Sequence, residues 1–214
     1  MGDTGHTITL YSPQSEAVIR VLERDGVCYS KPEYVAEKYG ESAPIFLTVY
    51  RWYAARAARL VPPPPGAQFP YWAFADPADV DLSGGGRVLR LRVPVEEAVL
   101  FDRDDWTRLL QLRYLGRTEE ETAQFQTQLA LRGLDGTKVM LSQFYPEWKQ
   151  AILDSWEGLF RHHHRLCRGD RTGVGGRPGG ALVPADPVAG GRLTTEQKQR
   201  RGSFFPRRCM FGWI

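Results

Sequence analysis

Arginine side chains along one predicted strand are the part of this sequence best suited to hold an anion. Arg87, Arg90 and Arg92 accompany Val88–Val93, where apolar residues alternate with arginine. This alternation predicts a strand with one face toward a core and the other toward water. Guanidinium groups on the polar face could bind phosphate or carboxylate. An ordinary solvated strand face would show the same pattern, so both interpretations stay open.

Aromatic residues form a second set with chemical potential. Trp and Tyr are large, and their polar tips need partners when they are buried. Such residues are expected to meet in one core or along one cleft that binds a ligand. The aromatic candidates are Trp52, Tyr71, Trp72 and Trp106, and Arg56 joins them because it shares a helix face with Trp52.

Patterns typical of catalysis are few. Glu96-Glu97 follows the arginine-bearing strand and could supply one carboxylate, but no second acid, base or nucleophile is tied to it by spacing. The sequence shows no serine-hydrolase, zinc-protease, paired-thiol or dinucleotide motif. His162–His164 predicts no metal site, because adjacent side chains on a helix diverge by about 100° and cannot converge on one ion. We therefore identify no reaction and expect no metal.

The elements that must position these residues predict an α+β fold, with a small mixed or antiparallel sheet and several packed helices. Extended segments are expected at Thr7–Tyr11, Gly26–Tyr29, Phe69–Phe74, Val88–Val93 and Ala98–Phe101. Three glycines, Gly84–Gly86, predict a tight turn before the fourth of these, since they lack the Lys-Ser/Thr of a phosphate loop. Helices are expected from Ser12 to Gly26, over Pro32–Tyr39, from Ser42 to Leu60, over Arg103–Leu115, from Thr118 to Gly133 and over Pro146–Phe160.

Composition divides the 214 residues into two parts. Residues 1–160 hold 17 Lys+Arg and 22 Asp+Glu, which predicts a single mildly acidic domain with no evident polyanion partner. Residues 161–214 hold 11 Lys+Arg and 3 Asp+Glu, with ten Gly and four Pro. This second part predicts a largely disordered basic tail. A shifted reading frame is another hypothesis for it, which the other frames of the genomic DNA would test.

The tail is the one place where nucleic acid could bind. Its arginines would neutralise phosphates. Phe204, Phe205 and Trp213 could stack on bases. Nucleic-acid binding is therefore one alternative function.

Hydropathy and cysteine content predict a cytoplasmic protein. No apolar run approaches the roughly 18–20 residues that span a bilayer, and the first residues lack a signal-peptide pattern. Cys28, Cys167 and Cys209 are too scattered to form a disulfide framework or a zinc cluster. We expect reduced thiols and no contact with a membrane.

Four segments resemble a bacterial family catalogued as domain of unknown function 3841. They are Thr9-Leu10-Tyr11-Ser12-Pro13-Gln14-Ser15, Tyr71-Trp72-Ala73-Phe74, Arg92–Asp102 with Trp106, and Ser155-Trp156-Glu157-Gly158-Leu159-Phe160. The resemblance covers about residues 8–160. It implies a small bacterial intracellular protein with no established activity. Separately, we expect no cofactor. A small-ligand or partner-binding module with an aromatic cleft is the function expected.

A fainter similarity is to ADP-ribosyltransferase-like domains, which also open with a short strand, a helix and a glycine turn. On that similarity Tyr11, Tyr29 or Ser30, and Glu97 would be the site residues. The alternative function it implies is a transferase that consumes NAD, with Glu97 stabilising positive charge on the ribose.

Overall fold

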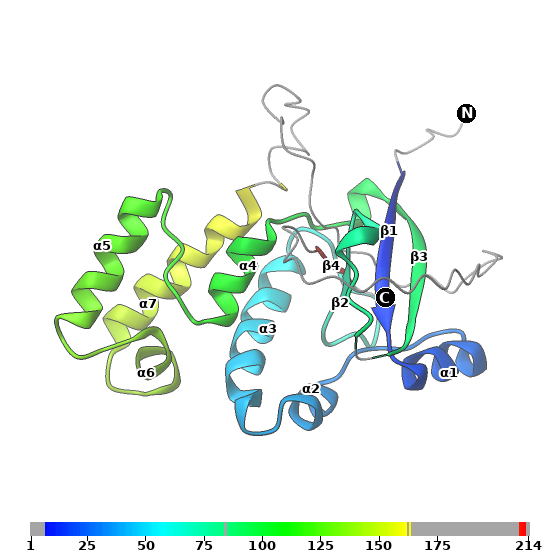
Figure 1. The fold of residues 1–214 in the computed structure, drawn as a ribbon, viewed down its shortest axis with the longest axis horizontal. Helices are drawn as coiled ribbons and strands as arrows, with labels where there is room; N and C mark the ends of the chain where they lie inside the picture. The colour runs from blue at the N-terminus through cyan, green and yellow to red at the C-terminus, as the bar shows by residue number, and fades with distance from the viewer. Residues whose placement is uncertain (1–6, 84, 162, 164–209, 213–214) are drawn as a thin grey trace.

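A computed structural model describes residues 7–83, 85–161, 163 and 210–212 (Figure 1). Its two longest strands, β1 (Thr7–Gln14) and β3 (Arg87–Pro94), form an antiparallel pair. Alternation along the pair buries Leu10 on one face and leaves Thr9 exposed on the other. The strands predicted at Thr7–Tyr11 and Val88–Val93 are confirmed, and β1 is three residues longer than expected. The segments Gly26–Tyr29 and Ala98–Phe101, also expected to be extended, do not form strands.

Two shorter strands extend this pair into a sheet. Tyr11 and Phe74 exchange two backbone hydrogen bonds of 2.8 Å, which places β2 (Tyr71–Ala73) beside β1. The far side of β2 pairs antiparallel with β4 (Met210–Gly212). The described residues thus form two two-stranded sheets, β1–β3 and β2–β4, which the Tyr11–Phe74 bridge joins, and the strands lie in the order β3, β1, β2, β4 (Figure 1). The α+β prediction is confirmed, and the sheet is antiparallel.

Helix α1 (Glu16–Asp25) begins later than the sequence predicts. Ser12 and Pro13 do not start it but belong to β1, and Ser15 is the N-cap, with its hydroxyl accepting from the Val18 N–H. A tertiary contact explains why Ser12 belongs to the strand and not to the helix, because the Ser12 hydroxyl donates a hydrogen bond to the Trp72 carbonyl of β2. The predicted end is confirmed, because Gly26 adopts a left-handed φ of 74°.

The next helices agree closely with expectation. Helix α2 spans Pro32–Tyr39 as predicted, and α3 spans Ala43–Ala57. Helix α3 ends three residues short of Leu60, and Pro62–Pro65 then exclude any continuation. The two helices lie below the sheet and along its side (Figure 1).

The second half of the chain is helical. Helix α4 (Arg103–Leu110) is five residues shorter than predicted, since Leu112 takes a positive φ of 54°. Helix α6 (Gly136–Leu141) was not predicted because six residues show too little periodicity. The others are α5 (Glu119–Ala130) and α7 (Pro146–Ser155), the latter continued by a 3₁₀ turn, Trp156–Phe160.

Aromatic side chains fill much of the main core, which is built mostly from α3 to α7 and the 3₁₀ turn Trp156–Phe160. Trp156 is fully buried, and Trp106 and Trp52 are exposed by 2 % and 9 %. A smaller core joins Leu10, Val93 and the chain that follows β3. Within the described residues, no helix has both the length and the apolar character needed to cross a membrane.

The predicted tail lies mostly outside the described residues. Of residues 161–214, the structure describes 161, 163 and 210–212, and the last three form β4. A strand there was not expected from the sequence. The domain boundary at residue 160 stays a prediction.

Candidate functional site

The register of β1 with β3 gathers three predicted site residues on one face. Tyr11 lies directly opposite Arg90, and Thr9 lies opposite Arg92. Residues paired in this way point to the same side of a sheet, with Cβ atoms about 4.5–5.5 Å apart. Thr9, Arg90 and Arg92 are exposed and Tyr11 is half-buried. We call these four residues the cationic sheet face.

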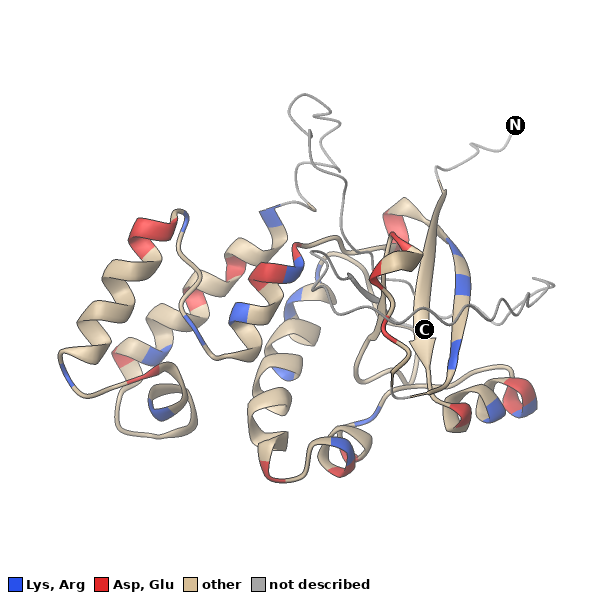
Figure 2. Cartoon of the chain, viewed as in Figure 1, with Lys and Arg blue, Asp and Glu red and all other residues tan. Residues whose placement is uncertain are grey.

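Charge pairing sets Arg90 and Arg92 apart from their neighbour Arg87. By alternation Arg87 points to the other side, where it binds Glu16 and Glu23 of α1 at 3.1 Å each. Within the described part of the chain, neither Arg90 nor Arg92 makes an ion pair. Figure 2 shows basic positions recurring along β3 with no acidic position among them.

The chemistry that this face can perform is recognition of an anion. Arg90 and Arg92 are two residues apart on one strand, so their Cα atoms lie about 6.6 Å apart. Guanidinium groups donate paired hydrogen bonds to phosphate and carboxylate oxygens. The Tyr11 ring beside them offers a flat surface for stacking.

Tyr29 and Glu97 lie away from this face, at opposite ends of the sheet. Glu97 ends the 3₁₀ turn Val95–Glu97, just beyond the β3 residue that pairs with Thr7. Tyr29 packs beside Gly66, and its neighbour Ser30 bridges Phe69, beyond the Gln14 end. Seven steps of about 3.3 Å make β1 roughly 23 Å long. The fold thus brings Tyr11 to the arginines and not to Tyr29 or Glu97.

The predicted aromatic candidates mostly pack inside the protein. The Trp72 and Trp106 rings lie 4.9 Å apart between centroids, nearly perpendicular. Trp52 meets Trp156 at 5.3 Å and carries the Arg56 guanidinium over its ring at 5.8 Å. Glu157 binds that guanidinium at 2.5 Å. These contacts join β2 to α4 and α3 to the last 3₁₀ turn.

The polar groups of the β2 side chains make hydrogen bonds to neighbouring parts of the protein. The half-buried Tyr71 hydroxyl lies 3.1 Å from the Cys28 thiol, and burial raises the pKa of Tyr71 well above its ordinary value. Tyr71 therefore stays a neutral hydroxyl. The Trp72 indole N–H donates to the Tyr50 hydroxyl at 3.3 Å.

Sequence reasoning missed a buried polar pair on β1. The Gln14 amide donates to the Ser12 hydroxyl at 2.7 Å, and that hydroxyl donates to the Trp72 carbonyl. Ser12 is fully buried and Gln14 is 7 % exposed. Their alternation with Leu10 was the available signal, because it places all three on the core face.

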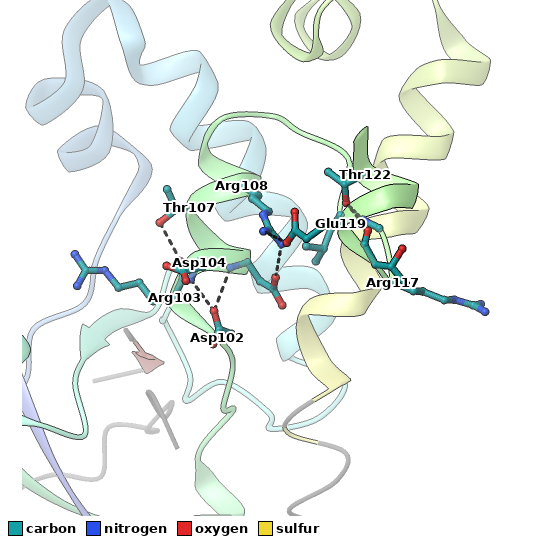
Figure 3. Close-up of polar contacts among 12 residues, drawn as sticks. Asp102, Arg103, Asp104, Thr107, Arg108, Arg117, Glu119 and Thr122 are labelled. Atoms are coloured by element: carbon teal, nitrogen blue, oxygen red, sulfur yellow. Dashed lines mark hydrogen bonds and ion pairs between the residues drawn. The ribbon is translucent and has the colours of Figure 1, made fainter. Parts of the chain in front are cut away.

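Charged residues at the start of α4 form a second cluster (Figure 3). The Asp102 carboxylate caps the helix by accepting from the Asp104 N–H at 2.8 Å. Arg108 binds Asp105 at 3.3 Å and Glu119 of α5 at 2.5 Å. Burial, with the nearby Asp102, raises the pKa of the Asp105 carboxyl.

The arginines of the α4 cluster have acidic partners, unlike those of the cationic sheet face. Arg108 lies between two carboxylates, and Arg161 approaches Asp105 at 4.0 Å. These arginines already have anionic partners, so they tie helices together and leave little positive charge for a ligand. The cationic sheet face is the stronger candidate for binding.

The predicted histidine run is only partly described. His163 is buried, while His162 and His164 lie outside the described residues. No three His, Cys, Asp or Glu side chains of the described part lie close enough to hold one metal ion.

Comparisons with known proteins identify a family and nothing more specific. The family model described as "Domain of unknown function (DUF3841)" matches residues 9–173. No curated protein and no solved structure matches the chain. The match begins one residue after the start expected from the sequence and extends 13 residues past the expected end.

Proposed function

Because the chain belongs to the family of domain of unknown function DUF3841, whose name gives no activity, we propose a function from the surface itself. The protein is a binding module for phosphate-bearing ligands, and the cationic sheet face is its contact surface. The observation that carries this proposal is the register that sets Tyr11 opposite Arg90 and Thr9 opposite Arg92 on an exposed face.

Electrostatics supports a phosphate group as the recognised part. An exposed arginine without an acidic partner keeps its charge available to a ligand. Arginine suits phosphate because its planar fork of N–H donors matches two oxygens at once. The net acidity of residues 1–160 does not oppose this, since exposed charges more than about 8–10 Å apart are largely screened at physiological salt.

The aromatic ring supports a ligand that also carries a flat group. Tyr11 lies across from Arg90, so a phosphate on the guanidinium would leave an attached base near the phenol ring. Stacking on an aromatic side chain is worth about 1–3 kcal/mol per base. A nucleotide combines both parts and is the ligand class proposed. Action in the bacterial cytoplasm belongs to the same proposal.

Calorimetric titration with a nucleoside diphosphate tests this function. Replacing both arginines, Arg90→Gln with Arg92→Gln, removes hydrogen bonds to charged groups worth about 1.5–3 kcal/mol each. We expect affinity to fall at least tenfold. The matched control is Arg51→Gln with Arg59→Gln, which removes the same charge from exposed positions within α3 and just beyond its end. Binding unchanged in the first pair, or weakened equally in both, would contradict the proposal.

Two alternative proposals are separated by added arms of the same experiment. A transferase that consumes NAD would use Glu97, so NAD binding or turnover lost in Glu97→Gln but retained without Arg90 and Arg92 would favour it. Nucleic-acid binding through residues 161–214 would give salt-sensitive binding of an oligonucleotide that survives the loss of both arginines.

A further inference from the structure

The cationic sheet face holds two successive contact positions, and a single nucleotide would fill only one of them. In the first position Arg90 of β3 lies opposite Tyr11 of β1, and in the second Arg92 lies opposite Thr9. Each position joins a cation that suits a phosphate to a β1 side chain that suits a base. The Tyr11 ring can stack on a base, and the exposed Thr9 hydroxyl can form a hydrogen bond with one.

The spacing of the two positions suits neighbouring nucleotides of one strand. Arg90 and Arg92 are two residues apart on β3, which separates their Cα atoms by about 6.6 Å. Phosphates of a duplex strand advance about 3.4 Å per nucleotide along the helix axis, and an unstacked single strand is more extended. Two long guanidinium side chains can therefore each reach one of two successive phosphates. A nucleoside diphosphate carries both phosphates on one bridging oxygen and a single base, so it leaves the second base contact unused.

The same contacts favour an unpaired strand over a duplex. Internal bases of a duplex are already stacked on both faces, whereas bases of a single strand can be turned out onto an aromatic side chain. Neither β1 nor β3 contains an acidic residue that would repel the phosphates.

We propose that the ligand of the cationic sheet face is single-stranded nucleic acid, with two successive nucleotides bound in the two positions. This inference rests on the proposed function and names its ligand more closely. The sugar–phosphate backbone follows the basic positions of β3 (Figure 2), and the bases lie across β1.

Calorimetric titration of the full chain compares 5′-phosphorylated dithymidylate with thymidine 5′-diphosphate. Each ligand carries two phosphates, but only the first carries a second base. We expect the dinucleotide to bind at least threefold more tightly. Arg92→Gln should weaken its binding at least tenfold and that of the diphosphate less than threefold, because the diphosphate depends mainly on Arg90. Arg51→Gln, an exposed position in α3, is the matched control.

Two further arms sharpen the test. Thr9→Val removes the hydroxyl and little else, and it should reduce the preference for the dinucleotide. The same comparison with 5′-phosphorylated diuridylate and uridine 5′-diphosphate distinguishes RNA from DNA as the strand bound.

The inference and the proposed function fail on different results. Equal affinity for dinucleotide and diphosphate in both pairs, or an equal loss of both ligands in Arg92→Gln, would overturn the inference. The proposed function would still stand if loss of Arg90 and Arg92 together weakened the diphosphate. Binding of neither ligand, or binding that is indifferent to both arginines, would overturn the two together.

Discussion

Ser12 joins two strands through one buried hydroxyl. It donates to the Trp72 carbonyl of β2 and accepts from the Gln14 amide at 2.7 Å. Both partners would lose a hydrogen bond if the hydroxyl were removed. A buried polar group without a partner costs about 1–3 kcal/mol.

We therefore predict that Ser12→Ala lowers the free energy of unfolding by about 1–3 kcal/mol. Urea denaturation followed by tryptophan fluorescence would measure the loss. Ser42→Ala is the matched control, because Ser42 is exposed and its side chain makes no cap bond to α3. A loss for Ser12→Ala no greater than for the control would show that the polar pair adds no stability.

Element boundaries show what local sequence could and could not predict. Helix α2 and the end of α1 were predictable because proline and glycine act locally at Pro32 and Gly26. The start of α1 was not, since Ser12 is drawn into the sheet by a residue 60 positions away. Helix α6 and β4 are too short to carry a period, and the pairing of β4 depends on β2.

The turn before β3 gives a prediction at this scale. Gly85 and Gly86 have φ of 78° and 100°, as the predicted glycine turn requires. A Cβ on Gly86 would overlap the Gln14 carbonyl, whereas one on Gly85 would meet open space. Left-handed backbone costs a residue other than glycine about 1–3 kcal/mol. Gly86→Ala should carry the clash in addition and lower stability by at least about 1 kcal/mol more than Gly85→Ala.

Denaturation of the two alanine variants would measure that difference. Amide contacts between β1 and β3 would show whether the register is kept. Equal stability of both variants would mean that the close approach of Gly86 to Gln14 does not constrain the strand pair.

For the molecule as a whole, fold class and family were predictable, and the arrangement of the site was predictable only in part. The alternation along the strand placed Arg90 and Arg92 on a polar face. Only the register between β1 and β3 shows that Tyr11 lies beside these arginines, and that Glu97 and Tyr29 lie away from them. The net charge of the domain did not predict the local charge of the proposed binding surface. A sum over residues 1–160 is acidic, while the solvent face of β1 and β3 is locally basic.

Mapping a phosphate ligand onto the full chain by NMR tests the central claim most directly. A ¹⁵N-labelled sample would be titrated with inorganic pyrophosphate. The proposed function predicts saturable shifts at Thr9, Tyr11, Arg90 and Arg92, with Arg108 of the paired α4 cluster unchanged. Saturable shifts confined to residues 161–214 or to the α4 cluster, with those four amides unmoved, would contradict it.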